Sequence, residues 1–239
     1  MLDSVFDEIS HTETRFIVYA PTGSEVPSWL ETYNVTVEHK PLDGDHPEPF
    51  LTIQSDGEFV GSLTLEKLDA LLTPPVVERA ADSLVSEGYQ VLFEVLNEVV
   101  FTALGRRQLL AVSREIEDRA YRFGAGTLRV CFQKLSTFRT QLRVYRQLAA
   151  DTDLEIHIYA LADWDPPAID GITYHDISGT ELELYWLLAF EDASAPSNSC
   201  GLFAREQAGA FTGYWTDNPV LVDRVAGELR ATIDDSPGN

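Results

Sequence analysis

The sequence predicts an α/β fold, with α+β as the alternative, built from a small N-terminal unit and a larger second domain. Short runs rich in Val, Ile and aromatic residues, which favour strands, alternate along the 239 residues with longer runs whose apolar residues recur at helical spacing. Gly, Pro and Asn-Pro signals separate these runs. Hydrophobic residues make up 44% of the chain, as in ordinary globular proteins, so a sizeable core is expected.

Residues 14–75 have the pattern of a compact unit with the order strand, helix, strand, strand, strand, helix. The expected elements are a strand at 15–20, a helix at 23–33 capped by Ser24, a strand at 34–39, a hairpin over 49–64 that turns at Asp56-Gly57, and a helix at 65–73 that stops at Pro74-Pro75. This order resembles a thioredoxin-like or glutaredoxin-like unit. The segment after its first strand reads APTGSE and has no cysteine, so a redox role is unsupported.

A helical connector is expected at residues 74–90, which sets a domain boundary near residue 80. The expected divisions are a small α/β domain at 1–80, either a degenerate thioredoxin-like unit or an unrelated module, a larger domain at 81–233, and a frayed tail at 234–239.

The larger domain continues the alternation. Strands are expected at 99–104, 127–132, 154–161, 172–177, 181–192, 200–207 and from 210, and helices at 105–123, 137–151 and from Pro219, where Asn218 is the cap. The start of the segment 92–104 has helical as well as strand character. These elements predict a mixed sheet of roughly five to six strands flanked by helices.

The chain is strongly acidic, with 39 acids, 17 bases and a formal net charge of −22. Three of the bases are lysines (Lys40, Lys67 and Lys134). Because the hydrophobic fraction is normal, this composition does not indicate disorder. It favours a folded protein adapted to high salt, where screening weakens self-repulsion. An acidic mesophilic protein is the alternative.

Residues 105–146 nevertheless hold ten bases against three acids. Helical i, i+4 pairs on the solvent side are expected for Arg114–Asp118, Glu115–Arg119 and Asp118–Arg122. Some arginines therefore offset acids of the chain itself. The remaining ones suggest an anion or partner surface, notably Arg139, Arg143 and Arg146 on one helix face. Nucleic acid is disfavoured because the rest of the chain is so negative.

Several classes of protein are not supported by the sequence. No run of about 18 apolar residues predicts a membrane span, and the N-terminus lacks the pattern of a secretory signal, so a cytoplasmic protein is expected. Cys131 and Cys200 stand far apart and match no metal or redox spacing. They are interpreted as buried apolar side chains.

No catalytic or metal motif is evident. GAGTLR (124–129) follows a helix and precedes a strand, the reverse of a phosphate-binding loop, so a turn is expected. His157 and His175 fall in neighbouring strands and could meet, but metal binding is disfavoured. Asp163 and Asp165 flank Trp164, and an enzyme that uses them or a histidine is kept as a minor alternative.

Aromatic residues gather late in the chain. They predict sheet core or, as the alternative, an aromatic-lined ligand pocket, for which Trp186 and Trp215 are the main candidates.

Four segments carry a family resemblance: SREIEDRA, then CFQ, then the Tyr-x-x-Leu helix YRQLA, then FTGYWTDNPVLVDRVAGEL. Together they resemble the DICT sensory domain, a family that accompanies diguanylate cyclases and two-component signalling proteins, over roughly residues 90 to 230. Cys131 stands where the family has a glycine before Phe-Gln. The matching positions are Ser113, Arg114, Glu117, Phe132, Gln133, Phe211, Gly213 and Trp215. The resemblance implies a sensor, in light responses among others, and the acidic composition is similar to that of stand-alone haloarchaeal members.

The expected function is therefore that of a non-enzymatic, cytoplasmic sensory protein. It would sense a small ligand or a light-linked signal, or dock a signalling protein such as a histidine kinase or a response regulator. A transcription-linked regulator that contacts nucleic acid through residues 105–146 is the alternative. No metal is expected, and the cofactor and oligomeric state stay open. The candidate ligand or partner surface comprises Ser113, Arg114, Glu117, Arg129, Gln133, Arg139, Arg143, Arg146, Trp186 and Trp215.

Overall fold

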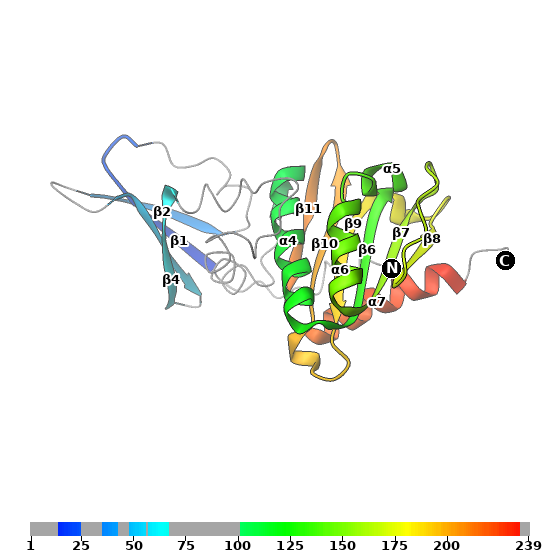
Figure 1. Ribbon diagram of the computed structural model, residues 1–239. Coiled ribbons are helices and arrows are strands. Elements are labelled where there is room, and N and C mark those ends of the chain that lie inside the picture. The colour runs from blue at the N-terminus through cyan, green and yellow to red at the C-terminus, as the bar shows by residue number, and fades with distance from the viewer. Residues whose placement is uncertain (1–13, 25–34, 43–47, 56, 67–100, 235–239) are drawn as a thin grey trace.

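The computed structural model describes residues 14–24, 35–42, 48–55, 57–66 and 101–234 (Figure 1). These residues form two mixed sheets together with helices, so the predicted α/β class is confirmed. The expected helices at 23–33 and 65–73, the connector at 74–90 and the boundary near residue 80 lie wholly or largely outside the described residues.

The first sheet has four strands in the order β2-β1-β3-β4. Its strands are β1 (Thr14–Ala20), β2 (Thr36–Pro41), β3 (Phe50–Ser55) and β4 (Glu58–Thr64). β1 runs parallel to β2 and antiparallel to β3, and β3 and β4 form the hairpin expected around residues 56–57. Phe16, Val18, Leu51 and Ile53 are fully buried in its core. The four expected strands are present, whereas the thioredoxin-like likeness and the separate domain at 1–80 stay predictions.

The second sheet has seven strands in the order β5-β11-β10-β9-β6-β7-β8, one more than the five to six expected. Its strands are β5 (Phe101–Leu104), β6 (Ala125–Lys134), β7 (Asp153–Leu161), β8 (Ile172–Asp176), β9 (Tyr185–Glu191), β10 (Cys200–Gln207) and β11 (Ala210–Thr216). β6, β7 and β8 are parallel, whereas β9, β10, β11 and β5 form an antiparallel series that joins β6.

Helices cover both faces of this sheet (Figure 1). They are α4 (Arg106–Phe123), α5 (Leu135–Phe138), α6 (Leu142–Asp151) and α7 (Pro219–Asp234). α4, α5 and α6 pack on one face, and α7 packs on the other. α5 and α6 form the crossover that parallel strands β6 and β7 require. As expected, Asn218 caps α7, since its Oδ1 accepts a hydrogen bond from the Val220 amide at 3.1 Å.

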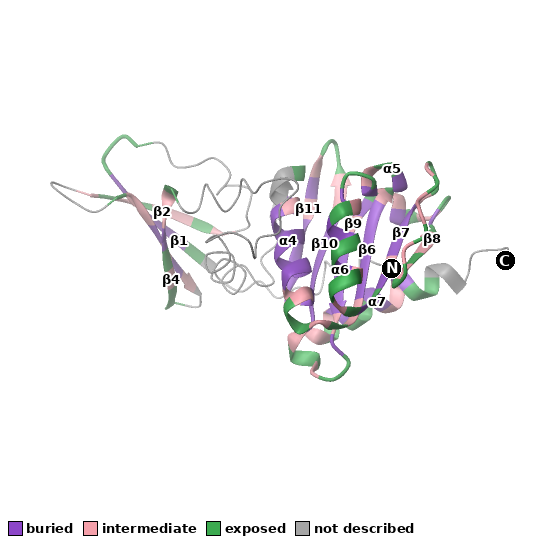
Figure 2. Cartoon of the chain, viewed as in Figure 1, coloured by how far each residue is buried: buried purple, intermediate pink, exposed green. Residues whose placement is uncertain are grey.

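Buried side chains concentrate along the central strands and on the sheet-facing sides of the helices (Figure 2). In β6, Leu128 and Val130 face α4 and α6, whereas Cys131 faces α7. The outer side of α6 is exposed, and this side carries Arg143 and Arg146.

Two expected elements needed correction. The strand expected at 181–192 begins only at Tyr185, because a short 3-10 helix (Glu181–Leu184) precedes it and buries Leu182. The Thr180 hydroxyl caps this turn by accepting from the Leu182 amide at 3.3 Å. The helix expected at 137–151 is divided into α5 and α6, because the chain turns through Arg139 to Gln141 between them.

A turn was expected over GAGTLR, but only Gly124 lies between α4 and β6, and Gly126 belongs to the strand β6. The segment follows a helix and precedes a strand, so it is not a phosphate-binding loop. Gly124 and Gly126 have φ values of +71° and +122°, which favour glycine. A Cβ at Gly126 would lie 2.6 Å from the carbonyl oxygen of Glu191 on β9. Glycine at this position therefore allows β6 and β9 to approach each other directly after α4 ends.

Candidate functional site

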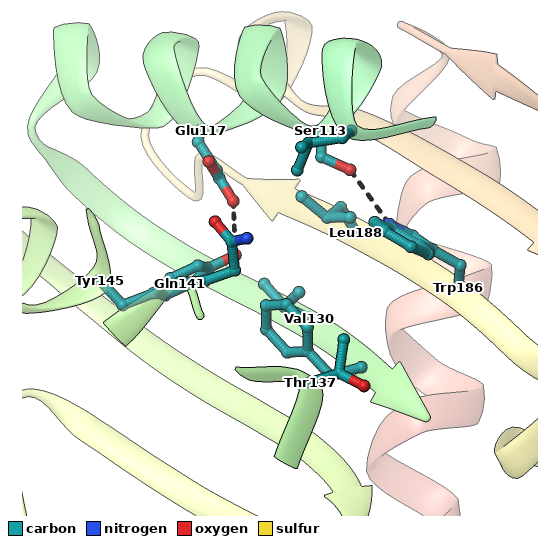
Figure 3. A pocket seen from close by; sticks show the side chains of 10 residues that line it. Ser113, Glu117, Val130, Thr137, Gln141, Tyr145, Trp186 and Leu188 are labelled. Atoms are coloured by element: carbon teal, nitrogen blue, oxygen red, sulfur yellow. Dashed lines mark hydrogen bonds between the residues drawn. The ribbon is translucent and has the colours of Figure 1, made fainter. Parts of the chain in front are cut away.

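A cavity lies between α4, the α5–α6 segment and the sheet (Figure 3). It holds about 290 Å³ of empty space, its opening to solvent included. The part of this space that a water molecule can enter amounts to about 20 Å³, roughly the room for one water. A larger ligand would fit only if lining side chains or α6 moved. The lining residues are Leu110, Ser113, Glu117, Val130, Phe132, Thr137, Gln141, Tyr145, Trp186 and Leu188.

The polar side of the cavity is a buried network between α4 and α6. Arg114 pairs with Oε2 of Glu117 and also donates to Oε1 of Gln141. The Tyr145 hydroxyl donates to Oε1 of Glu117 at 2.7 Å. Gln141 donates in turn to the Thr140 hydroxyl at 3.0 Å. Glu117 is only 2% exposed, yet each oxygen of its carboxylate has a hydrogen-bond partner. One partner is the Arg114 cation and the other is the Tyr145 phenol.

Burial and charge set the protonation states in this network. Burial alone would lower the pKa of Arg114, but the adjacent Glu117 carboxylate raises the pKa above its ordinary value. Burial, followed by the negative charge of Glu117, raises the pKa of Tyr145 well above its ordinary value. Arg114 therefore stays charged and Tyr145 stays a neutral hydrogen-bond donor.

The other polar contact of the cavity fixes the position of Trp186. Ser113 donates to the Leu109 carbonyl at 2.8 Å, one turn back along α4. Its oxygen accepts a hydrogen bond from Nε1 of Trp186 at 3.1 Å. The indole of this β9 residue is half-buried and packs edge-on against Phe211. Trp186 is therefore a rigid apolar wall of the cavity, held to α4 by one hydrogen bond.

The acids of the pairs expected on the solvent side of α4 are in fact buried, as is Arg114, which corrects that expectation. Arg114, Glu115, Glu117 and Asp118 are each at most 2% exposed. The predicted Glu115–Arg119 pair forms at 3.1 Å. Helical spacing identifies residues that share one face, but it does not reveal that this face is covered by other parts of the chain.

Eight of the ten bases of residues 105–146 fall into two groups. The first group pairs with acids of the chain, and it comprises Arg106 with Glu206, Arg114 with Glu117, Arg119 with Glu115 and Asp217, Arg122 with Glu115, and Arg129 with Glu191. The second group lies around α6. Arg139 stacks over the Trp164 ring at 5.8 Å, and Arg143 and Arg146 have no ion-pair partner within the described part of the chain. This group lines an open depression with Thr140, Leu142 and Gln147.

Besides the three arginines around α6, three more of the predicted site residues lie away from the cavity. Arg129 belongs to the α7 face, where its Nε donates to Glu191 at 2.7 Å and its Nη1 donates to Tyr159 at 3.2 Å. Gln133, at the end of β6, has a φ of +60° and donates to Glu206 at 3.0 Å. Trp215 is 1% exposed and belongs to the core, which is the first of the two alternatives for it. The cavity therefore unites Ser113, Arg114, Glu117 and Trp186, but not these three.

The residues of the minor enzyme alternative have structural contacts. Asp163 accepts hydrogen bonds from the amide and the hydroxyl of Ser136 at 2.8 and 2.6 Å, at the start of α5. These bonds lower the pKa of Asp163 below its ordinary value. The carboxylate therefore holds the α5 turn in place and stays ionised.

His157 and His175 do meet, as their strands suggested. Nδ1 of His157 lies 3.0 Å from Nε2 of His175, and the ring of Tyr159 stacks on His175 at 4.7 Å. Burial lowers the pKa of His157, and burial together with His157 lowers the pKa of His175 to about 4. The described residues contain no cluster of three or more side chains suited to a metal ion.

Both cysteines are free and buried, as interpreted from the sequence. Burial raises the pKa of each thiol to about 12, so both stay protonated. Among the described helices, none is long and apolar enough to cross a membrane.

A model of the DICT family, described as a sensory domain in diguanylate cyclases and two-component systems, matches residues 88–207, half of the chain. The chain belongs to the DICT family. The match confirms the resemblance carried by SREIEDRA and CFQ, whereas Phe211, Gly213 and Trp215 lie beyond the matched residues. All residues that line the cavity fall within the matched DICT segment.

No curated protein matches the chain. A polyphosphate kinase structure from Porphyromonas gingivalis is similar with a TM-score of 0.38 and 10% identity, over 97% of this chain and 47% of that one. The chain thus spans about half the length of that kinase, and a likeness at this level carries no argument about function.

Two residues that complete the buried network of the DICT cavity, Tyr145 and Gln141, were not among the predicted site residues. A signal was present, because Gln141 is a polar residue on the apolar stripe of Phe138 and Tyr145 and is 7% exposed. A polar side chain on an apolar stripe needs a buried partner, and here the partner is Arg114.

Proposed function

We propose that this DICT protein is a non-enzymatic, cytoplasmic sensor that binds a compact ligand in the cavity between α4 and α6 and signals to a partner such as a histidine kinase or a response regulator. The family supports this role, since DICT domains are sensory domains of signalling proteins. The observation that carries the proposal is the convergence of polar groups from α4, α6 and β9 on one buried cavity.

The lining indicates the chemistry of the ligand. Arg114 neutralises Glu117, so the cavity offers no net charge to a ligand. Val130, Phe132 and Leu188 supply apolar walls, and the Trp186 indole supplies a flat one. A small, neutral and largely apolar molecule with one or two hydrogen-bonding groups would reach Ser113 or Gln141 and bury its surface here after α6 or the lining side chains move to enlarge the cavity.

α6 connects the cavity to the surface of the protein, because one side of this helix faces the cavity and the other faces solvent. Tyr145 faces the cavity from α6, and Gln141 is the residue directly before this helix. A ligand that exchanged hydrogen bonds with either residue would favour one position of α6 over another. The signal would thus leave the cavity as a shift of a single exposed helix.

The proposal is tested on full-length protein purified from its native host. Small molecules released by denaturation are identified by mass spectrometry, and an absorption spectrum of the native protein checks for a chromophore, which would indicate a light-linked signal. Ser113→Ala and Trp186→Phe should each lower the bound amount. Ser136→Ala, outside the cavity, should not. A ligand retained equally by all variants would place the sensing site elsewhere.

A further inference from the structure

The exposed arginines of α6 differ from the paired arginines of α4 and β6 in their contacts. The chain has more than twice as many acids as bases, and the arginines of α4 and β6 that are described with a partner are paired with carboxylates. Arg143 and Arg146 are exposed and have no such partner within the described ranges. Two cations that have no carboxylate partner among the described residues of so acidic a chain are available to a partner from outside it.

We propose that the outer face of α6, formed by Arg139, Arg143 and Arg146, binds an acidic segment of another protein. This inference names the contact surface for the signalling partner of the proposed function, and it rests on that function only for the biological role of the contact. The surface itself rests on the charge and geometry described next.

The three arginines are arranged to act together. Arg143 and Arg146 lie three residues apart on α6, so their side chains project from the same helix face, with a rise of about 4.5 Å between them. Arg139 comes from the turn before α6 and is held over Trp164. All three line one open depression with Thr140 and Gln147, whose polar groups add hydrogen-bonding capacity.

Arginine on such a surface favours carboxylates. Its planar guanidinium donates two parallel hydrogen bonds to one carboxylate, which combines charge with geometric specificity. An acidic segment with two or three carboxylates would match the three arginines one to one. Opposite charges would also guide the encounter and fix its orientation.

Nucleic acid fits this surface less well than an acidic peptide does. A DNA duplex has one negative charge per roughly 1.7 Å of its axis and extends in both directions. A basic face of three side chains neutralises only a few of these charges, and the adjoining surface belongs to a chain of net charge −22. A short acidic segment instead contacts the arginines alone.

The position of α6 connects this surface to the cavity. Tyr145 lies between Arg143 and Arg146 in the sequence and points to the opposite side of the helix, where it donates to Glu117. A displacement of α6 that follows a change at Tyr145 would therefore also displace both arginines. Docking and sensing would be coupled through one helix.

The test uses full-length protein and three fluorescent probes: a short peptide of alternating Glu and Ala, the matching peptide of Gln and Ala, and a DNA duplex. Binding is measured by fluorescence anisotropy at the lowest KCl concentration at which circular dichroism shows the native fold. We expect the acidic peptide to bind, the Gln peptide not to bind, and added KCl to weaken binding.

The decisive variant is Arg143→Glu/Arg146→Glu, which should weaken peptide binding by at least about tenfold. Lys40→Glu/Arg224→Glu is the matched control, since it changes net charge equally at exposed or half-exposed positions on β2 and α7. Arg143→Gln/Arg146→Gln gives the same comparison should the reversed charges impair folding. Equal weakening by variant and control, or tighter binding of the DNA duplex than of the peptide, would overturn the proposal.

Failure of this proposal is distinguishable from failure of the proposed sensor function. Ser113→Ala and Trp186→Phe should lower retention of the cavity ligand while leaving peptide binding unchanged in ligand-free protein. Loss of peptide binding only in the arginine variants identifies the α6 surface, whatever the cavity binds.

Discussion

Tyr145 of α6 donates a 2.7 Å hydrogen bond to Glu117 of α4, and the other oxygen of this carboxylate pairs with Arg114. One buried carboxylate thus joins the two helices that enclose the cavity. Its two partners come from segments 28 and 3 residues away in the sequence, so the network forms only when α6 has packed beside α4.

Tyr145→Phe should lower the free energy of unfolding by about 1–3 kcal/mol, because it removes a hydrogen bond to a buried charged group and leaves one carboxylate oxygen unsatisfied. Urea denaturation followed by circular dichroism measures the change. Tyr174→Phe is the control, since this half-buried hydroxyl donates only to the Pro167 carbonyl, at 3.2 Å. If both variants lowered the free energy of unfolding equally, the hydrogen bond to Glu117 would contribute no more than an ordinary one.

Arg114→Met should be more destabilising, by about 3–5 kcal/mol, because Glu117 is then a buried charge without a cation. The double variant Arg114→Met/Glu117→Leu should recover part of this loss, since Glu117 is then no longer a buried charge without its cation; the buried Asp118, which also interacts with Arg114, still loses this charge. A double-mutant cycle with the single Glu117→Leu variant gives the coupling energy. Additive effects in that cycle would mean that the two side chains act independently.

The histidine pair predicts a pH dependence of stability. The pKa of His175 is lowered from 6.5 to about 4 in the folded state, so the unfolded chain binds a proton that the native pair resists. Stability should therefore decrease as the pH falls from about 6.5 to about 4, and this contribution should then level off. Denaturant titrations across that range should show a shallower slope for His157→Gln/His175→Gln. Parallel curves for the two proteins would contradict the assignment.

Gly126→Ala should destabilise the protein more than Gly209→Ala. Both glycines have positive φ, so alanine is strained at either position, by about 1 kcal/mol or more. At Gly126 the new Cβ would also lie 2.6 Å from the Glu191 carbonyl oxygen, whereas nothing lies within 4 Å at Gly209. Thermal melts of the two variants separate the cost of the steric overlap from that of the backbone. Equal melting temperatures would show that β9 moves aside freely.

The net charge of −22 predicts that salt stabilises the fold. We expect the melting temperature to rise from dilute buffer to molar KCl, as screening reduces repulsion among the acids. Differential scanning calorimetry in KCl and in sucrose of matched osmolality distinguishes screening from a general solute effect. A melting temperature independent of KCl would argue against adaptation to high salt.

Local sequence signals were sufficient to predict most strands and helices of the larger domain. The apolar stripe of α4, the glycines after it and the Asn218 cap of α7 were all recognised from neighbouring residues, because helix, turn and cap preferences act over a few positions. The 3-10 turn before β9 was missed, since the run ELEL alternates like a strand while the Thr180 cap and the burial of Leu182 hold it as a helical turn.

The sequence by itself determined the α/β class, the excess of acids, the DICT membership carried by SREIEDRA and CFQ, and the basic character of residues 105–146. Only the tertiary structure decided which of those arginines are internal and which are available. Arg114 and Arg143 have the same chemistry and both lie on amphipathic helices, yet one is buried against Gln141 and Glu117 and the other faces solvent. That difference depends on contacts between residues far apart in the chain, which helical periodicity does not encode.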